Sequence, residues 1–238
     1  MAHECHEVWE YFLNPEHRHP ASNLLEKTDL SERIAHQIKS YFYAYFGTHD
    51  FIEKTPRNTL RIPFLKELFP QAKFIFLFRQ GEDNINSLIN GWRAPNKFKP
   101  YKNQFQIKTK DYGTLDWSFA LVPEWQKLHG KSLAEICAYQ WLTCNQSMLD
   151  YQNIIPENQK YIIPYEKFIA QPHEILKACF EHLHIEYKPN FISNHITLKP
   201  VNYTSQPSKN KWKNENKAAI ESIQTLIQPM NQKLGYTI

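Results

Sequence analysis

A run of five consecutive apolar residues, Phe74–Phe78, constrains the fold of this chain more than any other feature of its sequence. The run is far too short to cross a bilayer. Apolar side chains at successive positions are typical of a strand buried on both faces, as in a parallel sheet. We therefore predict a strand over Lys73–Phe78. Shorter apolar runs predict two more strands, over Asp50–Glu53 and Tyr161–Pro164.

Helical patterns lie around these strands. Apolar residues at helical spacing, with proline or a capping residue near several starts, predict helices over Ser31–Phe46, from Pro63 to before Pro70, and over Glu82–Trp92, Leu133–Leu149, Gln171–Leu183 and about Asn214–Gly235, the last kinked at Pro229. Strands that alternate with helices indicate an α/β fold, a parallel sheet with helices on both faces. A length of 238 residues suits one domain, residues 1–238.

Three polar side chains come directly after the predicted strands: Lys54, Arg79 and Tyr165. In such sheets ligands bind beyond the carboxyl ends of the strands. Ser87 lies eight positions after Arg79, on the following helix. A guanidinium and a hydroxyl together donate well to a phosphate. The spacing therefore indicates an anion site, although an exposed strand end and an ordinary helix surface would show the same residues.

The longer sequence context carries a family resemblance. The segments KTPRN, RIPFL and LFPQAKFIFLFR, followed by the spacing of Ser87, Gly91 and Trp92, resemble the nucleotide-binding part of the sulfotransferase family. The resemblance continues through DWSFALVPEW, AYQW, YEKFIAQPHEILKACFEHLHI, LKPVNYTSQPSKNKW and a final LGY, and so covers most of the chain from about Phe51.

This resemblance implies a P-loop-type parallel sheet and transfer of a sulfuryl group from 3′-phosphoadenylyl sulfate to a hydroxyl or amine. It implies that Arg79 and Ser87 bind the 3′-phosphate and that Tyr165 contacts the adenosine. Lys211 would lie in the loop that closes over the nucleotide. Lys54 is the candidate for neutralising charge on the sulfuryl oxygens, although a surface lysine is the ordinary interpretation of that position.

Two further catalytic candidates follow from the resemblance. Ser193 matches a serine that assists transfer in the protein-tyrosine branch of the family, and its alternative is an ordinary loop serine. A base must also take the proton of the attacking acceptor. Glu4 is the nearest match to the glutamate that often has this role, while His6 and Glu7 remain alternatives.

The N-terminal residues allow two other interpretations. They include a set of possible zinc ligands, namely His3, Cys5, His6, His17 and His19, but the spacing fits no familiar zinc finger. The resembling family needs no metal, so we expect none. A frayed polar terminus is the remaining interpretation.

The sequence lacks the Gly- and Ser-containing loop that holds the 5′-phosphosulfate in sulfotransferases. None of the six glycines clusters near the N-terminus. We therefore expect a truncated domain without its first strand, loop and helix, which would leave neighbouring strand edges unpaired. The alternative function is an inactive fragment or nucleotide-binding remnant without transfer activity. A phosphate-loop kinase is a weaker alternative, because no GxxxxGK[ST] motif is present.

Composition sets the remaining expectations. A net charge of +4 suits an anionic nucleotide but is too small to indicate nucleic-acid binding. The N-terminus lacks the basic start and apolar stretch of a secretion signal, which predicts a cytoplasmic protein with no membrane span. Cys137, Cys144 and Cys179 fall on apolar helix faces and are expected to be free thiols. The segment Pro95–Phe119 suits an acceptor-facing loop, but carbohydrate, small molecule, lipid headgroup and peptide tyrosine all remain open as acceptors.

Overall fold

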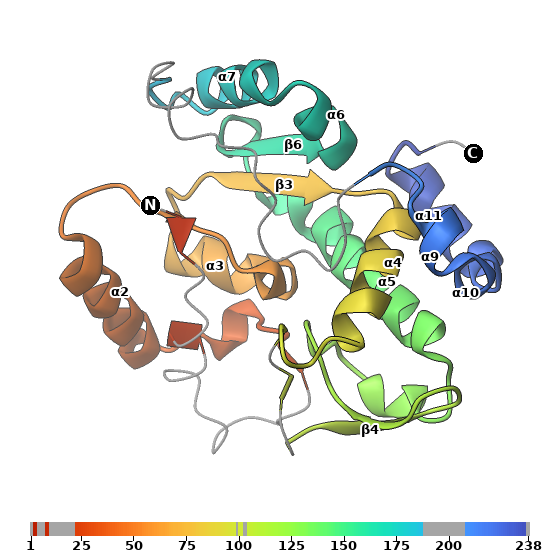
Figure 1. The fold of residues 1–238 in the computed structure, drawn as a ribbon. Coiled ribbons are helices and arrows are strands. Elements are labelled where there is room, and N and C mark those ends of the chain that lie inside the picture. The colour runs from red at the N-terminus through yellow and green to blue at the C-terminus, as the bar shows by residue number, and fades with distance from the viewer. Residues whose placement is uncertain are drawn as a thin grey trace.

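The computed structural model describes residues 2–3, 8–9, 22–98, 100–101, 104–187 and 208–236. Figure 1 shows helices and strands that alternate along this part of the chain. The strands are β1 (Ala2–His3), β2 (Ile52–Glu53), β3 (Phe74–Phe78), β4 (Gln106–Thr109), β5 (Gly113–Asp116) and β6 (Lys160–Pro164). The helices are α2 (Glu32–Phe46), α3 (Ile62–Leu68), α4 (Gly81–Trp92), α5 (Leu133–Tyr151), α6 (Tyr165–Ala170), α7 (Pro172–His182), α9 (Trp212–Glu215), α10 (Lys217–Glu221) and α11 (Gln224–Lys233).

Parallel strands with helices on both faces confirm the predicted α/β class. β3 pairs with β6 in parallel over their whole length, and β1 pairs with β2 in parallel. On one face of the β3–β6 pair, Ile163 packs with Cys179 of α7. On the other face, Phe76 and Phe78 pack with Met148 of α5. Figure 1 shows α6 and α7 on one side of this pair and α3 and α5 on the other.

The prediction that β3 is buried on both faces is wrong for one face. Ile75 is 44% exposed and Leu77 48% exposed, whereas Phe76 and Phe78 are buried. The reason is the narrowness of the sheet. Among the described residues β3 pairs only with β6, and β2 pairs only with β1, so neither strand has a neighbour on its second edge.

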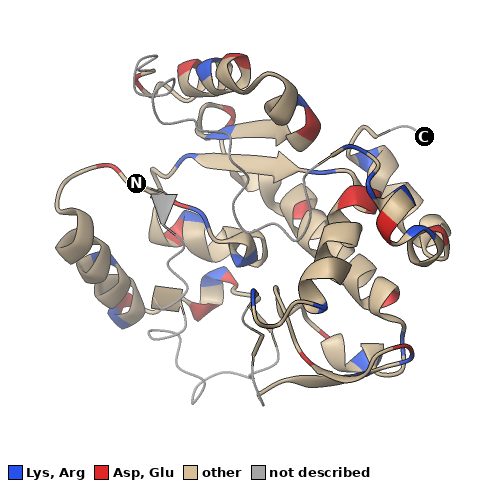
Figure 2. Cartoon of the chain, in the orientation of Figure 1, with Lys and Arg blue, Asp and Glu red and all other residues tan. Residues whose placement is uncertain are grey.

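The predicted C-terminal helix is divided into three shorter helices, α9, α10 and α11. The interruptions fall at Asn216, with φ −136°, and at Ser222–Ile223, while Pro229 lies inside α11 and does not separate the helices. At this interruption the side chain of Asn216 donates to the side chains of Asn86 and Asn90 of α4. Figure 2 shows the acidic start of α4 beside these C-terminal helices.

The polar segment expected to be a loop contains the antiparallel hairpin β4–β5. Its turn is closed by Thr109, whose Oγ1 donates to the carbonyl of Gly113 and accepts from the N–H of Tyr112. Gly113 has φ +70°, a conformation that glycine adopts without strain. In this hairpin only β4, Gln106–Thr109, alternates between exposed and buried side chains. Four residues are too few to identify a strand from the sequence pattern.

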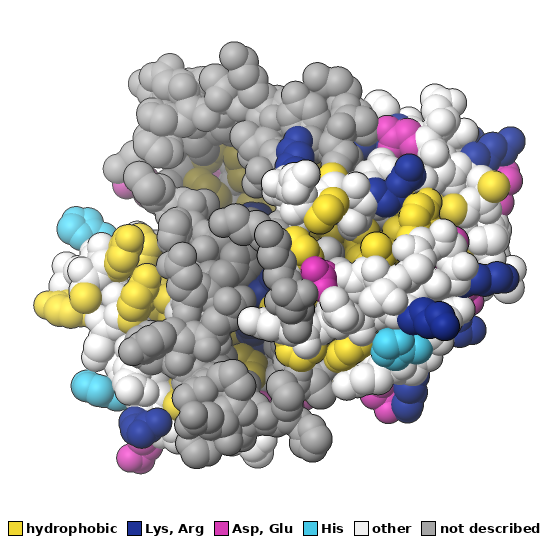
Figure 3. All heavy atoms as spheres, turned by 60° about the horizontal axis from the view of Figure 1, so that its bottom comes forward, with side chains coloured by type: hydrophobic (Ala, Val, Ile, Leu, Met, Phe, Trp, Pro, Cys, Tyr) yellow, Lys and Arg dark blue, Asp and Glu magenta, His cyan; other side chains and the backbone are white. Residues whose placement is uncertain are grey.

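The other helices begin and end close to their predicted bounds. α2 is capped by Ser31, whose Oγ accepts from the N–H of Ile34, and it buries Ile38 and Phe42. Figure 3 shows apolar side chains at the surface over this end of the molecule, where Tyr43 and Tyr45 are about two-thirds exposed at 66% and 65%.

Two further findings concern the described part of the chain as a whole. Cys137, Cys144 and Cys179 are free thiols, as predicted, and burial raises the pKa of Cys144 and of Cys179 to about 11. No helix among the described residues is both long enough and apolar enough to cross a membrane.

Candidate functional site

Arg79 follows β3 directly and is joined to the next helix. Its Nη1 donates to Oγ of Ser87 on α4 over 3.2 Å. The Ser87 hydroxyl in turn donates to the carbonyl oxygen of Asp83, 2.9 Å away on the preceding turn of α4. The chain turns from β3 into α4 at Gln80. This turn brings Arg79 and Ser87 into contact although they lie eight positions apart in the sequence.

Tyr165 reaches the same place from the neighbouring strand. Phe78 and Pro164 are register partners at the ends of β3 and β6, so the residues that follow them lie side by side. The Arg79 guanidinium carbon lies 4.8 Å from the centroid of the Tyr165 ring, within the range of a cation–π interaction. The structure therefore brings Arg79, Ser87 and Tyr165 together.

Glu166 fixes the two strand ends relative to each other. Its Oε1 accepts from the N–H of Gln80 at 3.1 Å, and its Oε2 accepts from the Tyr236 hydroxyl at 2.7 Å. The same hydroxyl lies 3.2 Å from the carbonyl oxygen of Phe78. Burial, together with the Glu166 carboxylate, raises the pKa of Tyr236, so the phenol keeps its proton and donates. Sequence reasoning missed this role of Glu166, whose only signal is its position next to Tyr165.

The C-terminal segment that carries Lys211 is hydrogen-bonded to α4. The N–H of Asn210 donates to Oδ2 of Asp83 over 2.8 Å, and Lys211 itself is only 8% exposed. Its Nζ lies 3.9 Å from Oε2 of Glu215. Asp83 thus contacts Ser87 through its backbone and the residue before Lys211 through its carboxylate. The other carboxylate oxygen of Asp83, Oδ1, is buried and has no hydrogen-bond partner among the described residues.

Glu215 is held by two side chains of α4. Both Asn86 and Asn90 donate their Nδ2 to Glu215 Oε2 at 2.7 Å. Asn86 is completely buried and Asn90 is partly exposed, so this polar interface runs from the interior to the surface of the protein. Sequence reasoning missed Asp83, Asn86 and Asn90, whose only signal is their helical spacing on one face of α4.

Lys54 lies on the other strand pair. It is exposed and directly follows β2, whose hydrogen-bonding partner is β1, whereas Arg79 follows β3. Glu53, the last residue of β2, accepts hydrogen bonds from Thr55, from Asn58 and, at 3.3 Å, from Trp9 Nε1. These contacts fix the backbone on both sides of Lys54.

The remaining candidates lie outside the described residues. These are Glu4 and Ser193, as well as His6 and Glu7 and the side chains of the zinc alternative. In the part of the chain that the structure covers, no three His, Cys, Asp or Glu side chains form a group suited to a metal ion.

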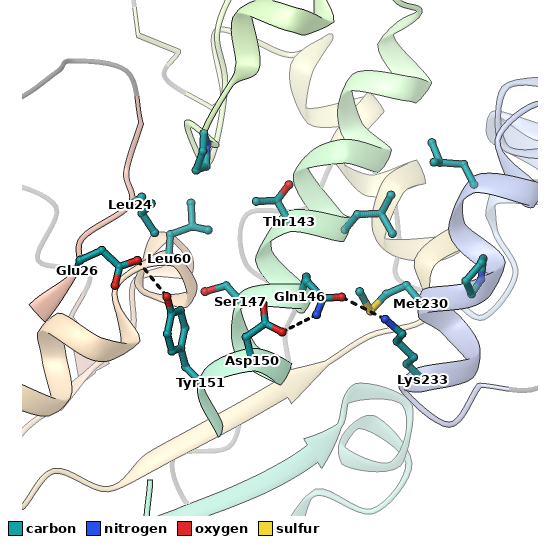
Figure 4. Close-up of a pocket in the computed structure, with 14 residues that line it drawn as sticks. Leu24, Glu26, Leu60, Thr143, Gln146, Ser147, Asp150, Tyr151, Met230 and Lys233 are labelled. Carbon is teal, nitrogen blue, oxygen red and sulfur yellow. Dashed lines mark hydrogen bonds between the residues drawn. The ribbon is translucent and has the colours of Figure 1, made fainter. Parts of the chain in front are cut away.

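A hollow of about 490 Å³ lies between α5, α11 and the residues before α2 (Figure 4). None of the candidate residues lines it. Its polar side chains bond to one another: the Tyr151 hydroxyl donates to Glu26 at 3.0 Å, and Gln146 donates to Asp150 at 2.6 Å. We therefore do not assign the anion site to this hollow.

Comparison with known proteins agrees with the fold and with the predicted family. Among solved structures, the sulfotransferase domain from the curacin biosynthetic pathway is 15% identical, with 86% of this chain and 69% of that one covered and a TM-score of 0.51. Sulfotransferase STF9 from Mycobacterium avium is also 15% identical, with a TM-score of 0.53; the match covers 84% of this chain but only 46% of STF9. At this identity both structures support the fold alone.

Sequence comparison identifies the family. No curated protein matches the chain. A model of the sulfotransferase family, however, matches residues 7–189, which is well over half of the sequence. The chain therefore belongs to the sulfotransferase family.

Proposed function

We propose that this protein transfers a sulfuryl group from 3′-phosphoadenylyl sulfate to a hydroxyl or amine of an acceptor. The observation that carries the proposal is the group formed by Arg79, Ser87 and Tyr165 at the carboxyl ends of two parallel strands. Such an edge is where ligands bind in α/β sheets. A guanidinium, a hydroxyl and an aromatic ring are chemically suited to a phosphate next to a nucleoside.

Each residue has a proposed role in binding the donor. Ser87 accepts one N–H of Arg79, which orients the planar guanidinium so that its other N–H groups can donate to the 3′-phosphate. Tyr165 contacts the adenosine. Lys211, in the segment anchored by Asp83, adds positive charge next to the nucleotide.

The proposed reaction is a direct in-line displacement. The acceptor oxygen or nitrogen attacks the sulfur and forms a new bond to it, while the bond from sulfur to the phosphate oxygen breaks. Adenosine 3′,5′-bisphosphate leaves with that electron pair. Lys54 stabilises the charge on the sulfuryl and bridging oxygens. Glu4 takes the acceptor proton, and Ser193 assists the transfer.

Titration of the purified chain with adenosine 3′,5′-bisphosphate tests the donor site. We expect Arg79→Ala to weaken binding roughly 10- to 100-fold, because a hydrogen bond to a charged group contributes about 1.5–3 kcal/mol. Arg33→Ala, which removes an exposed arginine on α2, is the matched control. Equal affinity of the wild type and Arg79→Ala would refute the assignment.

The second candidate function is nucleotide binding without transfer. It is favoured by the placement of Lys54 on a different strand pair from Arg79. An assay with labelled 3′-phosphoadenylyl sulfate and a panel of acceptors separates the two functions. Turnover supports the enzyme, whereas bisphosphate binding with no turnover for any acceptor class supports the second function.

A further inference from the structure

The last motif of the family resemblance, Leu234–Gly235–Tyr236, has no part in the proposed function. In the structure it ends α11 as a Schellman motif. The N–H of Gly235 donates to the carbonyl oxygen of Gln232 at 3.0 Å. The N–H of Tyr236 donates to the carbonyl oxygen of Asn231 at 2.9 Å. Gly235 has φ +81°, a conformation that glycine adopts without strain. The end of the helix therefore fixes the direction in which Tyr236 leaves it.

Tyr236 lies at the carboxyl end of β3. Its hydroxyl donates to Oε2 of Glu166 at 2.7 Å. The same hydroxyl lies 3.2 Å from the carbonyl oxygen of Phe78, the residue before Arg79. Leu234, from the same motif, packs against the apolar cluster that contains Phe78. Figure 1 shows α6 and α11 close to the tip of the β3 arrow. The C-terminal motif is therefore attached to the strand that precedes Arg79.

Side chains from distant parts of the chain hold the backbone on both sides of Arg79. Four contacts do so: the carbonyl oxygen of Phe78 with Tyr236 at 3.2 Å, the carbonyl oxygen of Arg79 with Trp141 at 3.3 Å, the N–H of Gln80 with Glu166 at 3.1 Å, and the N–H of Gly81 with Asn231 at 2.9 Å. Two of these partners belong to α11 and the motif that ends it. The backbone that carries the Arg79 guanidinium is therefore positioned partly by the C-terminal segment.

Glu166 extends this connection to the second donor residue, Tyr165, which directly precedes it. Its two carboxylate oxygens accept from Gln80 and Tyr236, one each. A hydrogen bond to a carboxylate is stronger than one between neutral groups, so the Tyr236 hydroxyl is an effective restraint on Glu166. Without that hydroxyl the residues that follow β3 and β6 are joined less firmly. The 4.8 Å contact between the Arg79 guanidinium and the Tyr165 ring depends on this junction.

We propose that Tyr236 is a positioning residue of the donor site, an inference that rests on the proposed function. Through Glu166, its hydroxyl holds Arg79 and Tyr165 in the geometry that binds the nucleotide. Tyr236 acts on the ligand only through those residues. Its removal lowers the affinity because the two donor residues leave this geometry, and the apparent affinity falls with the fraction of molecules that are competent to bind.

Titration with adenosine 3′,5′-bisphosphate tests the inference in the variant Tyr236→Phe, which keeps the ring and removes only the hydroxyl. We expect about three- to tenfold weaker binding, because one hydrogen bond that favours the competent geometry is lost. The matched control is Tyr151→Phe, which removes a hydroxyl that donates to Glu26 at 3.0 Å in the hollow of Figure 4. Its affinity should equal that of the wild type. Unchanged affinity in Tyr236→Phe, or an equal loss in the control, would overturn the inference.

A double-mutant cycle with Glu166→Ala tests the route through Glu166. If Tyr236 acts through this carboxylate, Tyr236→Phe should weaken binding far less in a protein that already lacks the carboxylate. Losses that simply add would show that Tyr236 acts independently of Glu166. All titrations are done well below the melting temperature of each variant, so that a loss of folded protein does not contribute.

The side chain of Arg79 gives a second readout that needs no ligand. In protein labelled isotopically at arginine, the NMR signal of the Arg79 Nε–H group is identified by its absence from Arg79→Ala. We expect this signal to shift in Tyr236→Phe and to stay in place in Tyr151→Phe. A signal that stays in place in Tyr236→Phe contradicts the positioning role. If the wild type binds no bisphosphate while the signal shifts as expected, the proposed donor site fails and the positioning of Arg79 stands. If the wild type and Tyr236→Phe bind the bisphosphate equally well, this inference alone fails.

Discussion

At the scale of single residues, Arg79 is held by contacts on several sides. Ser87 accepts from its guanidinium and the Tyr165 ring lies over it, while its backbone carbonyl accepts from Trp141 Nε1 at 3.3 Å. These contacts come from α4, α6 and α5. The guanidinium is therefore oriented before any ligand arrives, which reduces the entropy that binding must offset.

Gly91 permits the close packing of α4 against Phe119. A Cβ atom at this position would lie 2.3 Å from Cζ of Phe119, which is too close for any contact between carbon atoms. We expect Gly91→Ala to lower the free energy of unfolding by about 1–3 kcal/mol, because the ring must move out of a packed site. Urea denaturation measures this change.

The double variant Gly91→Ala/Phe119→Ala is the control for that prediction. Removal of the ring removes the clash, so the two substitutions should be less damaging together than the sum of their separate effects. Strict additivity would show that the Phe119 ring is not the reason for the glycine.

Sequence reasoning found the residues whose partners are close along the chain. Only the short connection between a predicted strand and the next predicted helix separates Arg79 from the helix that carries Ser87. Their contact therefore follows from the predicted elements. Asp83 and Glu166 bond to residues 127 and 70 positions away, Asn210 and Tyr236. No local pattern specifies such pairs, because they depend on how the C-terminal segment packs.

At the scale of elements, α5 begins with a capping box. The Ser132 hydroxyl accepts from the N–H of Glu135 at 3.3 Å, and the Glu135 carboxylate accepts from the N–H of Ser132 at 2.8 Å. The hydrogen bond from the Ser132 backbone lowers the pKa of Glu135. Because the folded-state pKa is lowered, the carboxylate adds stability above its ordinary pKa, and this stability is lost as the pH falls through the lowered value.

We therefore expect Glu135→Gln to lower the melting temperature at pH 7 and to have a smaller effect near pH 3. Thermal unfolding of both proteins across this range measures the difference. Glu221→Gln, which neutralises an exposed carboxylate on α10, is the control for the loss of one negative charge. A constant difference between the wild type and Glu135→Gln at all pH values would contradict the role of the carboxylate.

Helical periodicity predicted α2, α4 and α5 well because each buries one continuous stripe. It failed between Lys217 and Lys233, where the apolar residues Ile220, Ile223 and Ile227 continue at helical spacing although the helices are interrupted. The first interruption depends on Asn216, whose amide bonds to α4. A tertiary contact therefore overrides the local preference at this point.

At the scale of the whole molecule, α4 connects the strand end to the C-terminal segment. Ser87 of α4 accepts a hydrogen bond from Arg79. Asp83 and Asn86 of the same helix bond to Asn210, Glu215 and Asn216. Glu82 continues this interface by accepting from Asn231 at 3.0 Å. Displacement of the segment that carries Lys211 therefore requires several hydrogen bonds to α4 to break together.

Asp83 is the residue through which this connection is best tested. It is 3% exposed, and its Oδ2 holds the N–H of Asn210 next to Lys211. We expect Asp83→Ala to cost about 1–3 kcal/mol of stability, because it leaves a backbone N–H without its partner. We also expect it to weaken binding of adenosine 3′,5′-bisphosphate several-fold, because Lys211 is no longer positioned.

The variant Asp83→Asn distinguishes a role of Asp83 in holding the segment of Lys211 from a role of its negative charge. The asparagine side chain keeps an oxygen that can accept from Asn210, so it should restore most of the affinity for the bisphosphate if Asp83 acts by holding the segment. If Asp83 instead acts through its negative charge, Asp83→Asn and Asp83→Ala should change affinity alike. Titration of both variants under conditions where each remains folded distinguishes these outcomes. Only recovery of affinity in Asp83→Asn is consistent with a backbone anchor, because that variant keeps the acceptor and loses the charge.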